Sequence, residues 1–148
     1  MQTYHQILVA IDVSDEAGQV IERARDMAEQ NHAELCLLHV VEPVMTENSY
    51  DLITSIPVDV QDTLNNQAKE FLQRMQDAYS LSSTPLRVEI GSVKGEILRV
   101  AEEIKADLII VGTHGRHGVG MLLGSTANSV LHGTPCDVLA VRIKSTDS

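Results

Sequence analysis

A glycine-rich stretch at residues 111–126 has the residue types best suited to chemistry. It holds five of the nine glycines of the chain, at positions 112, 115, 118, 120 and 124. An apolar run from Asp107 leads into it, and a short helical pattern from Ser125 to Leu131 follows. A strand, a glycine-rich loop and a helix start build an anion site, because free N–H groups and the positive end of the helix dipole point at the loop. The stretch predicts a loop that holds nucleotide phosphates.

The spacing of these glycines separates this loop from two common phosphate motifs. GxxxxGK[ST] is absent, and GxGxxG is absent from the turn after the first predicted strand. What is present is Gly112-x2-Gly115-x8-Gly124-Ser125. Within it, Arg116 could pair with a phosphate or be solvated, and Gly118 and Gly120 could contact a ligand or keep a surface loop flexible. The spacing argues against P-loop and NAD-type binding.

Charge and composition limit the classes of partner. The 148 residues carry a net charge of −10, with a pI near 4.9. Duplex nucleic acids and anionic membranes need a basic face, so we expect neither as a partner. A small anionic ligand remains compatible, because surface charge is screened beyond roughly 8 Å while N–H donors act locally.

Hydropathy and cysteine content indicate a cytoplasmic protein. The chain shows no secretory signal pattern, and none of its apolar runs approaches the roughly 20 residues of a membrane span. Cys36 and Cys136 lie in apolar, strand-like segments. We expect both to be reduced and to serve as small core residues.

Five apolar runs alternate with four helical patterns, which predicts a parallel α/β sheet in a single domain over residues 1–148. Aromatic residues make up only 3% of the chain, so the core must be aliphatic. The predicted strands span 6–12, 33–41, 86–90, 107–111 and 136–142, and the predicted helices span about 15–31, 58–80, 97–106 and 124–132. Ligands of open α/β sheets bind at the carboxyl ends of the strands.

The chain resembles the universal stress protein family along nearly its whole length. The matching segments are QILVAID at residue 6, LLHVV at residue 37, DLIIVGTHG at residue 107, LLGSTANSVL at residue 122 and PCDVLAVR at residue 135. The resemblance implies a three-layer, Rossmann-like fold of the adenine nucleotide alpha hydrolase type, with a five-stranded sheet in the order 3-2-1-4-5. It also implies a stress-response homodimer formed through the last strand, from Val138 to Val141.

The same resemblance implies an ATP site, with Mg²⁺ as a candidate companion. One branch of the family binds ATP through G-x2-G-x9-G-[ST]; this chain has the glycines and the serine, with eight residues in place of nine. Asp12 is similar to the acid that binds the ribose hydroxyls, and Ala10 is expected beside it in the site. Val40 is similar to the residue whose backbone contacts adenine. The residues similar to the phosphate cradle are Gly112, Thr113, His114, Gly115, Arg116, Gly124, Ser125 and Thr126.

Several alternatives stand beside this hypothesis. Asp12 could instead cap the first helix, and His39 fits a hydrogen-bonded core histidine. His114 and His117 have HxxH spacing, yet no further ligands follow, so we expect no metal site there. No nucleophile elbow or defined carboxylate pair is present, so catalysis is not predicted. The competing functions are an interaction protein of the same fold that binds no nucleotide, and a slow ATPase or self-phosphorylating protein.

Overall fold

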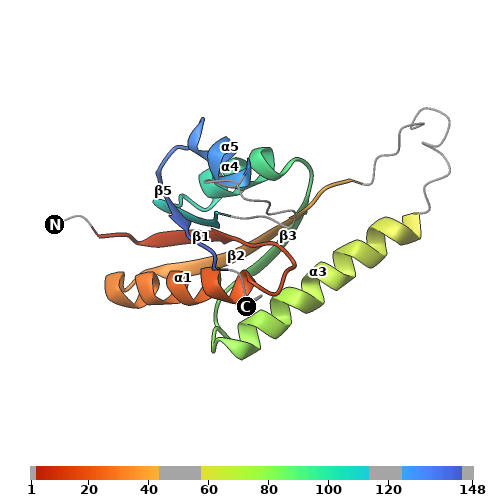
Figure 1. Cartoon of the computed structure of the whole chain (residues 1–148), viewed down its shortest axis with the longest axis horizontal. Coiled ribbons are helices and arrows are strands. Elements are labelled where there is room, and N and C mark those ends of the chain that lie inside the picture. Colours follow the sequence, from red (N-terminus) through yellow and green to blue (C-terminus); the bar gives the residue numbers. More distant parts are fainter. Residues whose placement is uncertain (1–2, 44–57, 114–124, 145–148) are drawn as a thin grey trace.

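The computed structural model describes residues 3–43, 58–113 and 125–144. Helices and strands alternate along most of this part of the chain (Figure 1). In chain order the elements are β1 (Gln6–Ala10), α1 (Ala17–Asn31), β2 (Glu34–Val41), α3 (Val58–Ala78), β3 (Leu86–Ile90), α4 (Val93–Glu103), β4 (Leu108–Gly112), α5 (Ser125–Leu131) and β5 (Asp137–Val141).

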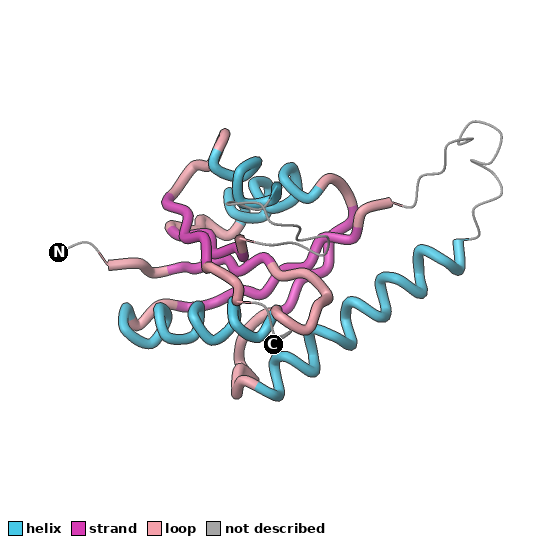
Figure 2. Tube along the Cα trace, viewed as in Figure 1, coloured by secondary structure: helices cyan, strands magenta, loops and turns pink. Residues whose placement is uncertain are grey.

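The strands form one parallel sheet in the order β3-β2-β1-β4-β5. β1 lies at its centre, where Ile7 pairs with Leu35 of β2 and with Leu108 of β4. Helices α1 and α3 cover one face of the sheet, and α4 and α5 cover the other (Figures 1 and 2). The predicted three-layer fold and strand order are confirmed.

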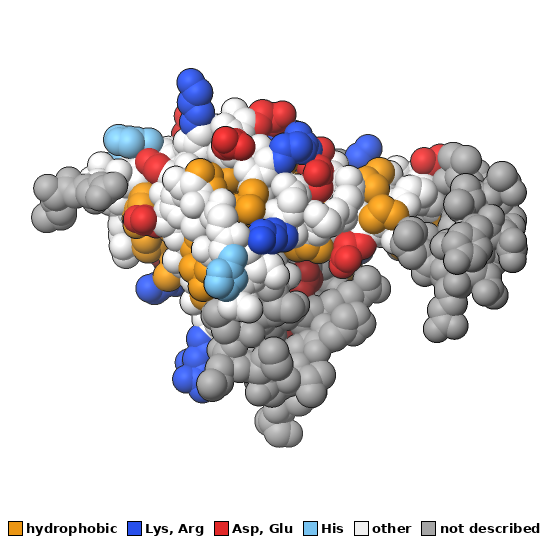
Figure 3. Space-filling model, turned by 90° about the horizontal axis from the view of Figure 1, so that it is seen from above, with side chains coloured by type: hydrophobic (Ala, Val, Ile, Leu, Met, Phe, Trp, Pro, Cys, Tyr) orange, Lys and Arg blue, Asp and Glu red, His pale blue; other side chains and the backbone are white. Residues whose placement is uncertain are grey.

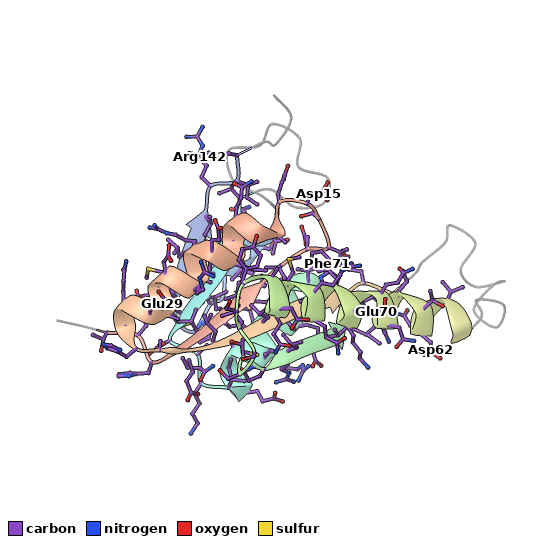
Figure 4. All side chains as sticks on the ribbon, turned by 90° about the horizontal axis from the view of Figure 1, so that it is seen from below. Asp15, Glu29, Asp62, Glu70, Phe71 and Arg142 are labelled. Carbon is purple, nitrogen blue, oxygen red and sulfur yellow. The ribbon has the colours of Figure 1, made fainter. Side chains whose placement is uncertain are left out.

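The sheet separates two apolar cores. Ile7 and Val9 face α1 and α3, whereas Leu8 between them faces α4 and α5, and all three side chains are fully buried. Because both faces are covered, the central strands are apolar at successive positions instead of alternating with polar residues. Figure 4 shows that α3 contacts the sheet near Phe71 and extends past it toward Asp62.

Two predicted boundaries near the first turn differ from the structure. β1 ends at Ala10, two residues earlier than predicted, and α1 begins at Ala17 instead of residue 15. The Ala17 N–H donates to the Ser14 carbonyl oxygen at 3.3 Å, and Glu16 at the helix start makes no side-chain cap. Ser14 therefore closes the turn through its backbone, and Asp12 lies in the loop between β1 and α1 instead of in a strand.

Ion pairs connect β3 to α4. Arg87 pairs with Glu89 at 3.1 Å and with Glu103, while Arg99 reaches Glu89 at 2.8 Å and Glu96 at 2.8 Å. Hydrogen bonds from the arginines lower the pKa of Glu96 and Glu103 and raise the pKa of both guanidinium groups. Figure 3, which views the molecule from the α4 and α5 side, shows acidic and basic side chains next to one another on this face.

Both cysteines are free thiols. Cys36 is buried in the core beneath α4 and α5, as predicted, and burial raises the pKa of its thiol. Cys136 is only partly buried and lies just before β5, where its N–H donates to the Thr134 hydroxyl at 3.2 Å. No helix in the described part of the chain has the length and apolar character needed to cross a membrane.

Candidate functional site

A pocket opens where the carboxyl ends of β1, β2 and β4 meet. About 530 Å³ of space between atoms lies within it, a figure that includes open solvent. Its walls come from β1 and the loop after it, β2, β4, the first turns of three helices, and the segment after β5. The lining residues are Ala10, Ile11, Asp12, Ser14, Ala17, Val20, Val40, Val93, Ile97, Val111, Gly112, Thr126 and Ile143.

Three helices begin at this pocket. Ala17 is the first residue of α1, Val93 the first of α4 and Thr126 the second of α5, and all three line it. In a parallel sheet the helix after each strand must start at the carboxyl end of that strand, so the positive ends of these helix dipoles converge there. Asp12 is the one charged side chain among the described lining residues, so the helix dipoles are the source of positive potential for an anion in this part of the structure.

The polar and apolar parts of the pocket have different sources. Asp12 and Ser14 come from the loop after β1, and both are half-buried. Val40, at 8% exposure, and Ile97, at 0%, supply apolar surface from β2 and α4. A mostly apolar pocket with a few polar groups is typical of a site for a small organic molecule.

His39 fixes the loop that carries Asp12. Its Nδ1 lies 2.7 Å from the Ile11 carbonyl oxygen, and since a carbonyl only accepts, Nδ1 must carry the proton. The Ile11 N–H donates to the Leu38 carbonyl oxygen at 2.9 Å. Ile11 lies one residue past the end of β1, and residues of β2 bind both its N–H and its carbonyl oxygen. These two bonds fix the direction of the backbone where it leads into Asp12. The predicted hydrogen bond of His39 is confirmed, but the residue is half-buried and does not lie in the core.

Gly112 has a packing role that its predicted phosphate role did not include. A Cβ on this residue would lie 2.6 Å from Ile143 Cδ1 and 3.2 Å from Val20 Cγ2. Both neighbours line the pocket. A glycine at the end of β4 thus lets α1 and the chain after β5 close over the strand.

Thr113 is turned toward the C-terminal segment. It is 8% exposed, its N–H donates to the Val141 carbonyl oxygen at 2.9 Å, and its Oγ1 accepts from the Ile143 N–H at 3.1 Å. It is absent from the pocket lining. Its predicted contact with the phosphates thus remains a prediction. Its hydrogen bonds to Val141 and Ile143 are a structural role that the sequence did not indicate.

The structure brings five of the predicted site residues together: Ala10, Asp12, Val40, Gly112 and Thr126. His114, Gly115, Arg116 and Gly124 lie outside the described residues, as does the HxxH pair, and Ser125 is described only as the start of α5. Within the described ranges, no group of three or more His, Cys, Asp or Glu side chains could hold a metal ion.

Sequence reasoning missed the residues that complete the walls. Ile97 opens the predicted helix 97–106, but α4 begins four residues earlier, at Val93, which the sequence placed in a glycine turn. Only the placement of α4 brings both residues to the end of the sheet. Ser92 caps α4 by accepting the Gly95 N–H at 3.1 Å, and this serine ahead of an apolar helical pattern is a signal that could have placed Val93 at a helix start. Ile143 gave no comparable signal.

Known proteins resemble this chain along its whole length. The model of the universal stress protein family matches residues 3–142. Universal stress protein A homolog 2 of Coxiella burnetii is 42% identical over 147 residues, covering 97% of this chain and 99% of that protein. Among solved structures, universal stress protein UspA from Lactobacillus plantarum has a TM-score of 0.76 at 28% identity, covering 96% of this chain and all of that one.

A second solved structure is a universal stress protein in complex with cAMP. Its TM-score is 0.66 at 24% identity, covering 95% of this chain and 98% of that one. At this identity the likeness shows the fold alone. The family match and the relative at 42% identity, taken with the sheet order and the pocket at the strand ends, show that this chain belongs to the universal stress protein family.

Proposed function

We propose that the protein binds an adenine nucleotide, ATP with Mg²⁺, in the pocket at the carboxyl ends of β1, β2 and β4, and that the nucleotide acts as a ligand or switch in a stress response. The observation that carries this proposal is the pocket itself, where three helix starts and Asp12 surround an apolar cavity. Helix starts suit phosphates, a carboxylate suits the ribose hydroxyls, and apolar walls suit a purine.

Each part of the nucleotide has a proposed place. Asp12 accepts hydrogen bonds from the ribose hydroxyls, beside Ala10. The Val40 backbone contacts adenine, whose faces pack on the apolar side chains around it. Gly112 and Thr126 stand at the two ends of the glycine-rich stretch, on the phosphate side of the pocket. The predicted contacts with Thr113 and with His114, Gly115, Arg116, Gly124 and Ser125 complete the cradle.

The cAMP complex of a structural neighbour supports the choice of adenine. A bound molecule in a protein of the same fold shows that the fold can hold an adenine nucleotide, and the helix starts here favour a ligand with more phosphate charge. This chain carries a net charge of −10, so a divalent cation bound with the phosphates would reduce the repulsion between protein and ligand.

We also propose that two copies of the chain associate through β5. This strand lies at an edge of the sheet, and its four apolar residues, from Val138 to Val141, all remain partly exposed. Edge strands with unpaired backbone groups and apolar side chains are usually covered. Sedimentation at micromolar concentration should show a dimer, and Leu139→Lys, which places a charge at this edge, should shift it toward monomer. A wild-type monomer would contradict the proposal.

Thermal unfolding with and without Mg-ATP tests nucleotide binding. A ligand at 100 times its Kd adds about 2.7 kcal/mol to the free energy of unfolding, and we expect a clear rise in Tm that Asp12→Ala reduces. The protein must first be freed of co-purified nucleotide. An unchanged Tm at millimolar Mg-ATP would contradict the proposal. The predicted cytoplasmic location is tested separately by cell fractionation.

A further inference from the structure

The chain after β5 is tied to the pocket by a set of hydrogen bonds that we call the C-terminal clasp, formed by Gln19, Thr113, Ile143 and Lys144. The Ile143 N–H donates to Thr113 Oγ1 at 3.1 Å. The Lys144 N–H donates to Gln19 Oε1 at 2.8 Å, and Gln19 Nε2 donates to the Lys144 carbonyl oxygen at 2.7 Å. α1 and the residue just after β4 thus hold Ile143 and Lys144, the second and third residues after β5.

Glutamine is chemically suited to this task. Its side-chain amide offers a donor and an acceptor side by side, so one residue can satisfy both backbone groups of Lys144. A glutamate could accept but not donate, and a lysine could donate but not accept. Figure 4 agrees with the arrangement: Arg142, just after β5, lies at the same end of the molecule as Asp15, just ahead of α1.

The clasp places one residue in the pocket. Ile143 is 8% exposed and lines it. Because Gly112 has no Cβ, there is room for the Ile143 side chain: a Cβ at this position would lie only 2.6 Å from Ile143 Cδ1. The family match ends at residue 142, so Ile143 and Lys144 lie just beyond the part of the chain that the family model covers.

We propose that Gln19 and Thr113 are positioning residues for ligand binding, which hold Ile143 as one wall of the pocket. The proposal rests on the proposed nucleotide function. A ligand that needs this wall binds only those protein molecules in which the clasp is closed. Its apparent Kd is therefore its intrinsic Kd divided by the fraction of protein molecules with a closed clasp, which we call the closed fraction. Without Gln19, Lys144 loses both bonds to α1, and the closed fraction falls.

Calorimetric titration with Mg-ATP tests the proposal. In Gln19→Ala, which removes both bonds, we expect the Kd for Mg-ATP to rise roughly 5- to 10-fold, because the closed fraction falls by that factor. Gln19→Glu can still accept from the Lys144 N–H, so its Kd should rise less. The matched control is Gln30→Ala, since Gln30 is an exposed glutamine of the same helix that lies away from the pocket. Its Kd should equal that of the wild-type protein.

Thr113 supplies a second pair of variants, whose effect on affinity combines the clasp with the phosphate contact proposed above, so the Gln19 variants decide between the two. Thr113→Val removes the acceptor for the Ile143 N–H and keeps the shape, so we expect weaker binding; Thr113→Ser keeps a hydroxyl and should recover most of the loss. The Tm of each ligand-free variant separates positioning from folding. A variant that lowers Tm while binding Mg-ATP as tightly as wild type would show a merely structural clasp and overturn the proposal.

The remaining outcomes are also decisive. Equal affinities in wild type and in the Gln19 and Thr113 variants would overturn this inference and leave the nucleotide function standing. The same loss of affinity in Gln30→Ala would overturn it as well, because the effect would not depend on the clasp. Failure of the wild-type protein to bind Mg-ATP would overturn the proposed function and this inference together.

Discussion

Adding one methyl group to Gly112 tests how the pocket wall is packed. The Cβ of Gly112→Ala would lie 2.6 Å from Ile143 Cδ1 and 3.2 Å from Val20 Cγ2, so the Ile143 side chain must move. Overpacking of this kind costs about 1–3 kcal/mol. Alanine also restricts the unfolded chain, which offsets about 0.4–1 kcal/mol where the backbone suits it, as in a strand. We expect a net loss of roughly 1 kcal/mol in the free energy of unfolding, or a Tm lower by roughly 3 °C.

Urea denaturation followed by circular dichroism, at one fixed protein concentration, measures this loss. The matched background is Ile143→Val, which removes the Cδ1 atom that the new methyl group would meet. In that background Gly112→Ala should cost less, because only the longer contacts with Val20 Cγ2 at 3.2 Å and with Cγ1 of residue 143 at 3.3 Å remain. The difference is the coupling energy between the two sites, which we expect to be about 0.5 kcal/mol or more. An equal cost of Gly112→Ala in both backgrounds would refute the contact between Gly112 and Ile143.

Three further predictions concern other parts of the fold. His39→Leu removes the donor to the loop after β1, so it should lower the free energy of unfolding by about 1 kcal/mol and weaken Mg-ATP binding. His39→Asn can still donate and should retain more of the stability and of the affinity. If chemical denaturation and calorimetry show the same losses for both variants, His39 does not have this role. A thiol reagent at neutral pH should label Cys136 before Cys36, because Cys36 is 3% exposed and burial raises the pKa of its thiol; mass spectrometry of the peptides decides, and faster labelling of Cys36 would count against the packing. The hydrogen bond from Arg87 lowers the pKa of Glu103 below its ordinary value of 4.5, so this pair stabilises the protein above that pH and the contribution is lost as the pH falls through the lowered pKa. Glu103→Gln should therefore flatten the pH dependence of Tm in acid at low salt, and an unchanged profile would show that the pair adds nothing.

The local pattern of apolar residues was sufficient to predict the elements of the sheet. β1 and β4 are apolar at successive positions because helices cover both faces of the sheet, and such runs are legible in the sequence. The strand order could not be read from these runs, because no single strand specifies its neighbours; it came from the family resemblance. The ends of β1 and α1 were misplaced, because backbone hydrogen bonds at Ser14 and Ile11, not side-chain caps, determine where they stop and start.

The residues of the candidate site were predictable where a residue type in its sequence context indicated a single role. Asp12 after a buried strand pointed to the pocket, and the structure places it there. Gly112 was assigned a single role, whereas its missing Cβ also makes room for Ile143, which only the three-dimensional packing reveals. Ile143 itself was invisible, because nothing in a short polar tail indicates that an apolar residue folds back onto α1 and β4.

Amide chemical-shift mapping during a titration with Mg-ATP locates the bound nucleotide on the protein. We expect saturable shifts at the carboxyl ends of the strands, at Asp12, Val40 and Ile143 among others, and none at the opposite end of the sheet, where Leu35 and Thr84 line a separate groove. An unchanged spectrum at millimolar Mg-ATP, or shifts confined to Leu35, Thr84 and their neighbours, would contradict this expectation.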